Sequence, residues 1–172
     1  MDGFIVRPSE TLPLFEKINK DWKEWGYTEV SERVDTVIMG RRTYENIKSQ
    51  VDKVPYIDKD TYIITREMRQ REGRIRFYAD DPKELVNKLQ MKGGKDILVD
   101  GGAEIVRMML RDDLLDELII TIVPMIVGNG IRLFGDQIQG VDLKLIESKS
   151  YDSGLVQLVY KISKNSLCRN MA

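Results

Sequence analysis

The sequence contains no histidine and a single cysteine, Cys168, among its 172 residues. Without histidine, neither a Ser-His-Asp triad nor a His-containing zinc site can form, and one cysteine allows no thiolate cluster and no intrachain disulfide. Carboxylates, tyrosine, lysine, arginine or a bound cofactor must therefore carry any chemistry. A lone cysteine fits a reducing compartment, so we expect a cytoplasmic protein.

The sequence also has no long apolar run and no excess of charge of one sign. No run is long enough to cross a bilayer, and 27 basic and 28 acidic residues give a formal net charge of −1. This balance gives no electrostatic reason to expect a nucleic-acid or membrane partner. The hydrophobic fraction of 42% is sufficient for a core. We expect one domain over residues 1–164 and a flexible tail over 165–172.

Strands and helices alternate through the middle of the chain, which then closes with a hairpin around Asp152-Ser153-Gly154. This order predicts an α/β sandwich whose sheet is largely parallel, with an antiparallel C-terminal edge. Apolar periodicity and turn residues predict helices over 12–25, 40–47 and 103–111, and strands over 34–39, 61–65, 74–78, 96–99, 116–124, 141–148 and 155–163.

A further helix is expected to begin at Asp81. Asp81 suits the N-cap, Pro82 the first helical position, and Glu84 falls three residues after the cap. Leu85 and Val86 follow as part of the buried stripe.

Two of the predicted strand-to-helix turns carry glycine, at Met39–Thr43 and at Asp100–Ala103. A helix N-terminus leaves backbone N–H groups free and has a partial positive charge, so it suits a phosphate. Arg41, Arg42 and Thr43 add side-chain donors to the first turn. The alternative for each turn is a glycine that only permits a tight bend. Neither turn is a G-x-G-x-x-G fingerprint or a P-loop.

These turns resemble a known superfamily. The segment "VIMGRRTYENI" is similar to the adenosine-phosphate-binding turn of dihydrofolate reductases and their relatives. The segment "ILVDGGAEIVRMMLRDDLLDELIITIVPMIVGNGIRLF" resembles the reductase domain of the bifunctional deaminase–reductases of riboflavin synthesis. The opening "MDGFIV" resembles the Asp-Gly turn after the first strand of the same superfamily.

The resemblance implies a three-layer α/β/α sandwich with a dihydrofolate-reductase-like mixed sheet, an NADPH cofactor and a homodimer. The paired arginines modestly favour NADPH over NADH. The residues expected at the cofactor are Gly40, Arg41, Arg42 and Thr43 at the adenosine-side phosphates, Thr65 and Arg66 near the adenosine ribose, and Gly101, Gly102, Ala103 and Glu104 at the pyrophosphate. Asp2 and Asp100 would face the nicotinamide and the substrate. No metal is expected.

The sequence departs from the pattern of these relatives in three ways. One is that "GRRTYE" is closer to the folate-reductase-like branch, whereas "VDGG" is closer to the riboflavin-pathway branch, which more often has Glu than Asp. The relatives also have a full strand before the Asp-Gly turn, whereas this chain opens with Met1-Asp2-Gly3, so we expect the natural start to lie upstream of Met1. Ala103 stands where folate-reductase relatives often have a third glycine.

The preferred hypothesis is hydride transfer from NADPH to a ribosylaminopyrimidine intermediate of riboflavin biosynthesis. Asp100 is the first candidate for managing the proton and Asp2 the second. The alternatives are that Asp100 caps the following helix and that Asp2 only forms its turn. Reduction of dihydrofolate or a pterin, with an acid such as Glu16 or Asp21 on the first helix, stays open. So does a dimeric nucleotide-binding module without turnover.

Overall fold

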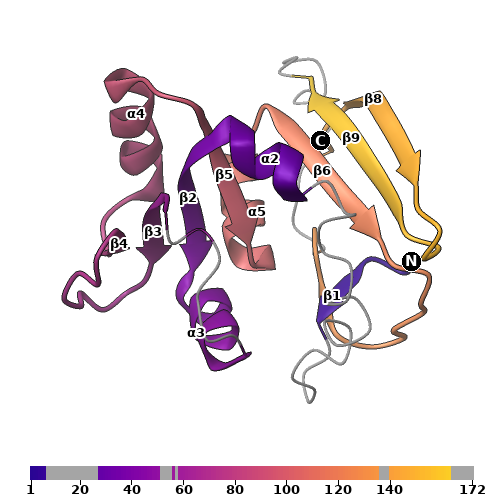
Figure 1. Ribbon diagram of the computed structural model, residues 1–172, viewed down its shortest axis with the longest axis horizontal. Coiled ribbons are helices and arrows are strands. Elements are labelled where there is room, and N and C mark those ends of the chain that lie inside the picture. The colour runs from indigo at the N-terminus through magenta and orange to yellow at the C-terminus, as the bar shows by residue number, and fades with distance from the viewer. Residues whose placement is uncertain (7–26, 51–55, 57, 136–139, 164–172) are drawn as a thin grey trace. The chain divides into compact units, whose positions relative to one another are not determined.

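The structure is a computed structural model (Figure 1). In it the chain divides into two compact units. The first unit comprises Met1–Gly26 and Met109–Ala172, and the second comprises Tyr27–Met108. The structure describes residues 1–6, 27–50, 56, 58–135 and 140–163, without the side chains of Val6, Tyr27 and Gln50. The helix predicted over 12–25 and the tail over 165–172 lie outside these residues. One domain over 1–164 stays a prediction.

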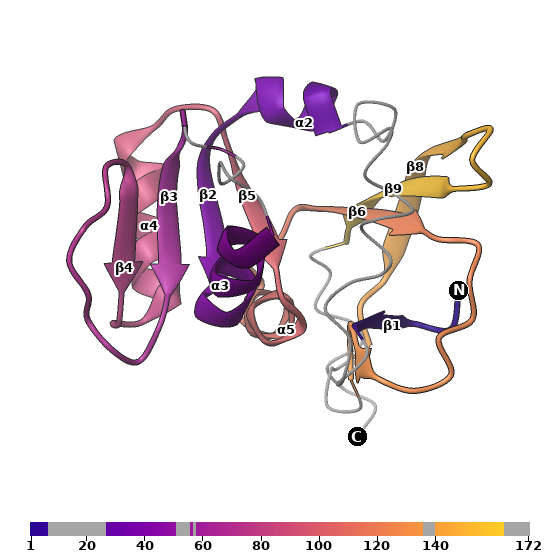
Figure 2. The ribbon, with the colours of Figure 1, turned by 60° about the horizontal axis from the view of Figure 1, so that its bottom comes forward.

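A parallel sheet organises the second unit. Its strands are β2 (Val34–Gly40), β3 (Asp60–Ile64), β4 (Ile75–Tyr78) and β5 (Asp96–Gly101), in the order β4-β3-β2-β5. All three strand pairings are parallel. The helices are α2 (Tyr27–Arg33), α3 (Arg41–Gln50), α4 (Pro82–Lys92) and α5 (Ala103–Arg111). Figure 2 shows α3 and α4 on opposite faces of this sheet, which gives the layering of helix, sheet and helix.

The core of the second unit centres on β2, which is the most buried strand. Val37, Ile38 and Met39 have no exposed surface, as expected for a central parallel strand covered on both faces. Val37 and Met39 pack with Ile63 of β3 and Tyr44 of α3 in one cluster. This packing holds the start of α3 directly beyond the end of β2.

The N-terminus of α4 confirms the predicted cap. The Asp81 carboxylate accepts a 2.9 Å hydrogen bond from the Lys83 N–H, and Pro82 is the first helical residue. Leu85 and Val86 are buried. The sequence predicts this helix start well, because the capping residue, the proline and the apolar stripe all indicate that α4 begins here.

Antiparallel strands organise the first unit. Strands β6 (Glu117–Ile122), β9 (Val156–Ile162) and β8 (Leu143–Ser150) form a sheet in that order, and β1 (Phe4–Val6) pairs with β7 (Ile131–Arg132). The β8–β9 hairpin turns through residues 151–155, as predicted.

The predicted mixed α/β class is confirmed, with parallel strands in the middle of the chain and an antiparallel C-terminal hairpin. Within the first unit, the antiparallel strands pair among themselves in the orders β6-β9-β8 and β1-β7. The short elements α2, β1 and β7 were not predicted, since three and two residues of strand carry no measurable periodicity. Among the described residues, no helix is both long and apolar enough to cross a membrane.

Candidate functional site

Three of the sequence-predicted segments meet at one edge of the parallel sheet. Gly40 of β2 lies in register with Ile64 of β3, and Met39 lies in register with Gly101 of β5. The carboxyl ends of β2, β3 and β5 therefore lie side by side, followed by Arg41, Thr65 and Gly102. Ligands of open α/β sheets bind beyond this edge.

A hydrogen bond joins the two glycine turns directly. The Gly102 N–H donates to Oγ1 of Thr43 at 2.8 Å, so the turn after β5 is fixed to the first turn of α3. The Gly102 carbonyl accepts from the N–H groups of Ile105 and Val106, which makes Gly102 the N-cap position of α5. The peptide between Gly101 and Gly102 is cis.

Glycine suits this junction because neighbouring atoms would crowd a side chain there. A Cβ at Gly102 would lie 3.1 Å from the Thr43 hydroxyl, and one at Gly40 would lie 3.1 Å from Cγ1 of Ile105. Gly101 has φ of +91°, a conformation that favours glycine. These glycines therefore do more than permit a bend, since they let two helix starts approach each other.

The helix starts offer donors that the helices themselves cannot use. The first N–H groups of an α-helix have no acceptor within it, and those of α5 belong to Ala103 and Glu104. At α3 the corresponding groups belong to Arg41 and Arg42. Both helices direct the positive ends of their dipoles to the same edge, which suits an anion with more than one phosphate.

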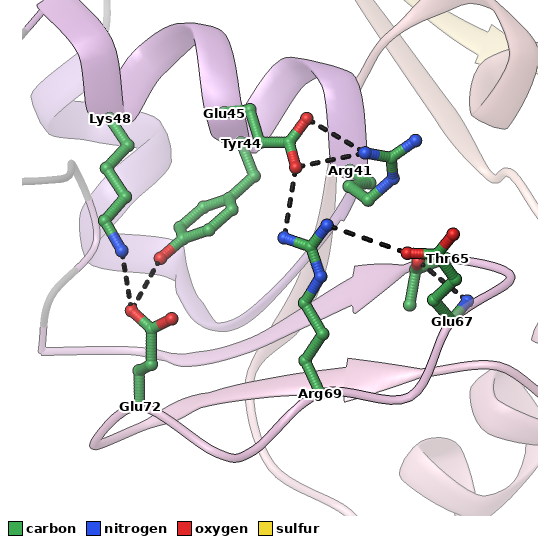
Figure 3. Close-up of polar contacts among 8 residues, drawn as sticks. All are labelled: Arg41, Tyr44, Glu45, Lys48, Thr65, Glu67, Arg69 and Glu72. Carbon is green, nitrogen blue, oxygen red and sulfur yellow. Dashed lines mark hydrogen bonds and ion pairs between the residues drawn. The ribbon is translucent and has the colours of Figure 1, made fainter.

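The Arg41 side chain belongs to a network of ion pairs at the start of α3 (Figure 3). Its Nη1 donates to both oxygens of Glu45 at 3.1 Å, and Nη1 of Arg69 donates to the same carboxylate at 3.1 Å. Glu67 lies 3.9 Å from the other end of the Arg69 guanidinium. Desolvation would raise the pKa of Glu45, but the hydrogen bonds from Arg41 and Arg69 outweigh it and lower that pKa.

A second carboxylate anchors the far side of α3. Glu72 accepts hydrogen bonds from Nζ of Lys48 at 2.8 Å and from the Tyr44 hydroxyl at 3.0 Å (Figure 3). The Lys48 bond, aided by Tyr44, lowers the pKa of Glu72. Tyr44 is buried, and its ring packs edge-on against Phe77. The helix that carries Arg41 and Arg42 is thereby fixed to the segment before β4.

Two other arginines predicted at the cofactor have no ion-pair partner among the described residues. Arg42 and Arg66 are exposed, and neither forms an ion pair with any described residue. Arg66 follows Thr65, which is buried and whose Oγ1 accepts a 3.2 Å bond from the Glu67 N–H. Arg42 and Arg66 thus leave two guanidinium groups ready to bind an anion at the ends of β2 and β3.

Asp100 lies near the end of β5 and is half-buried. Desolvation raises its pKa from 3.8 to about 6, against a lowering effect of the Tyr56 hydroxyl, which donates to Oδ1 at 3.3 Å. No hydrogen bond to this carboxylate comes from the described start of α5, where the Gly102 carbonyl begins the helix instead. The capping alternative for Asp100 has no contact to support it.

Asp2 belongs to the first unit and has a different environment. Its Oδ2 accepts a 2.7 Å hydrogen bond from the Gly128 N–H, and this bond lowers its pKa. The Met1 amino group lies 3.9 Å from Oδ1 and donates to the Met125 carbonyl at 2.9 Å. Asp2 therefore connects the N-terminal turn to the Gly128-Asn129-Gly130 loop.

Three residues of this site were not predicted from the sequence. Glu45 had a usable signal, because it follows Arg41 by four residues on a predicted helix. Arg69 and Tyr56 lie in irregular segments, and nothing in their local sequence indicates contact with Glu45 or Asp100.

Comparisons with known sequences identify the family of this chain. The RibD C-terminal domain family matches residues 17–157. The uncharacterised proteins YwjB and YyaP of Bacillus subtilis strain 168 are 31% and 30% identical, each over 93% of this chain and over 91% and 89% of their own lengths.

Solved structures show the same fold. A protein of Shewanella sp. PV-4, provisionally named as a riboflavin biosynthesis protein, has a TM-score of 0.82 at 25% identity, covering 95% of this chain and 94% of its own. For Acinetobacter baumannii RibD the TM-score is 0.64 at 19% identity, over 86% of this chain and 51% of that one. The resemblance seen in the glycine turns is confirmed, and so is the general interpretation as a reductase-like protein. The chain belongs to the RibD C-terminal domain family, within the dihydrofolate-reductase-like superfamily.

Proposed function

We propose that this protein is an NADPH-dependent reductase that transfers hydride to a ribosylaminopyrimidine intermediate of riboflavin biosynthesis. The observation that carries the proposal is the hydrogen bond between Gly102 and Thr43, which brings two helix N-termini to one sheet edge. Membership of the RibD C-terminal domain family supports the reductase class. The family supports only this class, and the identities of the cofactor and the substrate are part of the proposal.

The donor set at this edge fits a dinucleotide. The N–H groups at the start of α5, from Ala103 and Glu104, would bind the pyrophosphate. The start of α3 and the exposed Arg42 would bind phosphate on the adenosine side. Arg66, beyond β3, would lie by the adenosine ribose with the buried Thr65. Two guanidinium groups without ion pairs favour a 2′-phosphate, and hence NADPH.

Arg41 has a different role in this proposal. Its guanidinium already shares Glu45 with Arg69, so it contributes order to the start of α3 as well as charge. Because Glu45 is partly exposed, its ion pairs add little to stability. They fix the two arginines in one geometry before an anion arrives, which lowers the entropy lost on binding.

NADPH, when bound, supplies the hydride, and the protein must orient the substrate and manage one proton. Asp100 suits the proton because burial raises its pKa to about 6, so a fraction of the carboxyl is protonated near neutral pH. The Tyr56 hydroxyl orients Oδ1. Asp2 is less suited to hold the proton, because the Gly128 N–H stabilises the ionised form of its carboxyl group. Glu16 and Asp21, the acids considered for a folate substrate, lie outside the described residues.

The direct experiment measures NADPH oxidation with the riboflavin-pathway ribosylaminopyrimidine and with dihydrofolate in parallel. We expect oxidation with the pyrimidine only. Oxidation with dihydrofolate alone would replace the substrate assignment with folate reduction. Tight NADPH binding without oxidation by either compound would favour a nucleotide-binding module. Absence of NADPH binding in a fluorescence titration would contradict the proposal as a whole.

Selectivity for NADPH should depend on Arg42 and Arg66. Replacing either with alanine is expected to raise the KM for NADPH about tenfold, since a charge-assisted hydrogen bond to phosphate is lost. The KM for NADH should change little, because NADH has no 2′-phosphate. Lys83→Ala is the matched control, because Lys83 is exposed on α4 and forms no ion pair with a described residue. Equal losses with both cofactors would contradict the assignment.

Asp100→Asn should separate stability from turnover. The wild-type carboxyl, with its pKa raised from 3.8 to about 6, binds more protons when folded than when unfolded between these values. Wild-type stability therefore falls as pH rises through this window, and the Asn variant should gain relative stability by pH 7 in urea unfolding. Turnover should drop about a hundredfold or more if Asp100 supplies the proton.

Tyr56→Phe is the companion variant for Asp100. It removes the hydroxyl that lowers the pKa of Asp100, so the pH midpoint of turnover should move upward. Unchanged turnover in Asp100→Asn, or an unmoved midpoint in Tyr56→Phe, would remove Asp100 from the reaction.

A further inference from the structure

The loop that joins β6 to β7 contains the sequence Gly128-Asn129-Gly130, which the proposed reductase reaction does not use. The Asn129 side chain is exposed, and the flanking glycines have φ of +77° and +153°. Both are conformations that glycine adopts readily and other residues rarely do. Because Gly130 has no Cβ, nothing on that residue hinders its backbone nitrogen from approaching the side-chain amide of Asn129.

The backbone N–H of Gly130 is also free to move. No described residue accepts a hydrogen bond from it. The Gly128 N–H, by contrast, is held by Oδ2 of Asp2 at 2.7 Å. Strand pairing resumes only at Ile131, which lies opposite Val6 of β1. The nitrogen that follows Asn129 therefore belongs neither to a strand ladder nor to a hydrogen-bonded turn.

Exposure alone does not distinguish Asn129 from the other described asparagines. Asn46 on α3 and Asn87 on α4 are exposed as well. The residues that follow them, Ile47 and Lys88, carry side chains and lie inside helices, where the backbone N–H groups bond to carbonyls of the preceding turn. Only the Asn129 amide combines exposure with a free glycine nitrogen beside it.

We propose that Asn129 is a site of spontaneous deamidation, with water as the co-reactant. The Gly130 nitrogen loses its proton and attacks Cγ of Asn129; the N–Cγ bond forms, the Cγ–Nδ2 bond breaks, and ammonia leaves. Water then opens the resulting cyclic succinimide. Opening at Cγ leaves aspartate, whereas opening at the backbone carbonyl leaves isoaspartate, in which the chain runs through the side chain. Asparagine is a thermolabile residue for this reason.

Contacts on both sides of Asn129 hold the N-terminal segment, residues 1–4. Before Asn129, the Gly128 N–H donates to Asp2. After it, the Leu133 N–H donates to the Gly3 carbonyl at 3.0 Å, and the Arg132 guanidinium lies 4.7 Å from the centre of the Phe4 ring. The geometry of the loop at residue 129 therefore decides whether both sets of contacts can form together.

Deamidation weakens this attachment in two ways. The Gly128 N–H lowers the pKa of Asp2, so the Asp2 carboxyl is ionised at neutral pH, and a new carboxylate at position 129 adds a like charge nearby. Isoaspartate also lengthens the backbone between Gly128 and Gly130 by one carbon atom, which displaces one side of the loop relative to the other. We expect residues 1–6 to be held less firmly in the deamidated protein.

Incubation of the full chain in heavy-oxygen water at mildly alkaline pH tests the reaction. Mass spectrometry of peptides should show loss of the amide at Asn129 and uptake of one heavy oxygen there, while Asn46 and Asn87 keep their amides. Asn129→Gln is the matched control, because it retains an exposed amide but forms the larger cyclic imide far less readily. Absence of uptake at 129, or equal uptake at 46, 87 and 129, would overturn the inference.

Hydrogen exchange tests the consequence for the N-terminal segment. The Gly128 and Leu133 amides should exchange faster in the deamidated wild type than in fresh protein, since their hydrogen bonds open more often. Incubated Asn129→Gln should match its fresh sample. Unchanged exchange at both amides in a fully deamidated sample would contradict the weakened attachment. Neither experiment involves NADPH, so each outcome is independent of the proposed reductase activity.

Discussion

The hydrogen bond from the Gly102 N–H to the Thr43 hydroxyl is the contact on which the candidate site depends. Parallel pairing brings the ends of β2 and β5 into register, but it leaves the following turns free to diverge. The Thr43 hydroxyl fixes the second turn to the first, and Gly102 leaves room for it. Two helix N-termini thereby share one edge, and their partial charges add toward a single anion.

The charged residues near this contact differ in their interactions. Glu45 binds Arg41 and Arg69, whereas Arg42 and Arg66 are exposed and form no ion pair with a described residue. Asp100, at the same edge, has its pKa raised by burial, which suits a carboxyl that must hold a proton. Under the proposed function, this sheet edge combines anion donors with a proton carrier, which a reductase that uses a phosphorylated cofactor requires.

Sequence reasoning reached the elements with several agreeing signals and missed those with few. The cap at Asp81 and the helix over 103–111 could be predicted, because capping residues and apolar spacing agree there. The glycine turns were recognisable by resemblance, but the bond between Thr43 and Gly102 depends on strand order, which local sequence does not encode. For the same reason, Tyr56 could not be assigned to Asp100, which is 44 residues away.

The central claim is that the linked glycine turns hold the cofactor, and titration of NADPH into Thr43→Val and Thr43→Ser tests it most directly. Valine keeps the shape but removes the acceptor for the Gly102 N–H, whereas serine retains the hydroxyl. We predict that the dissociation constant for NADPH rises about tenfold in Thr43→Val and stays near the wild-type value in Thr43→Ser. Equal NADPH affinity in the wild type and Thr43→Val would contradict the account.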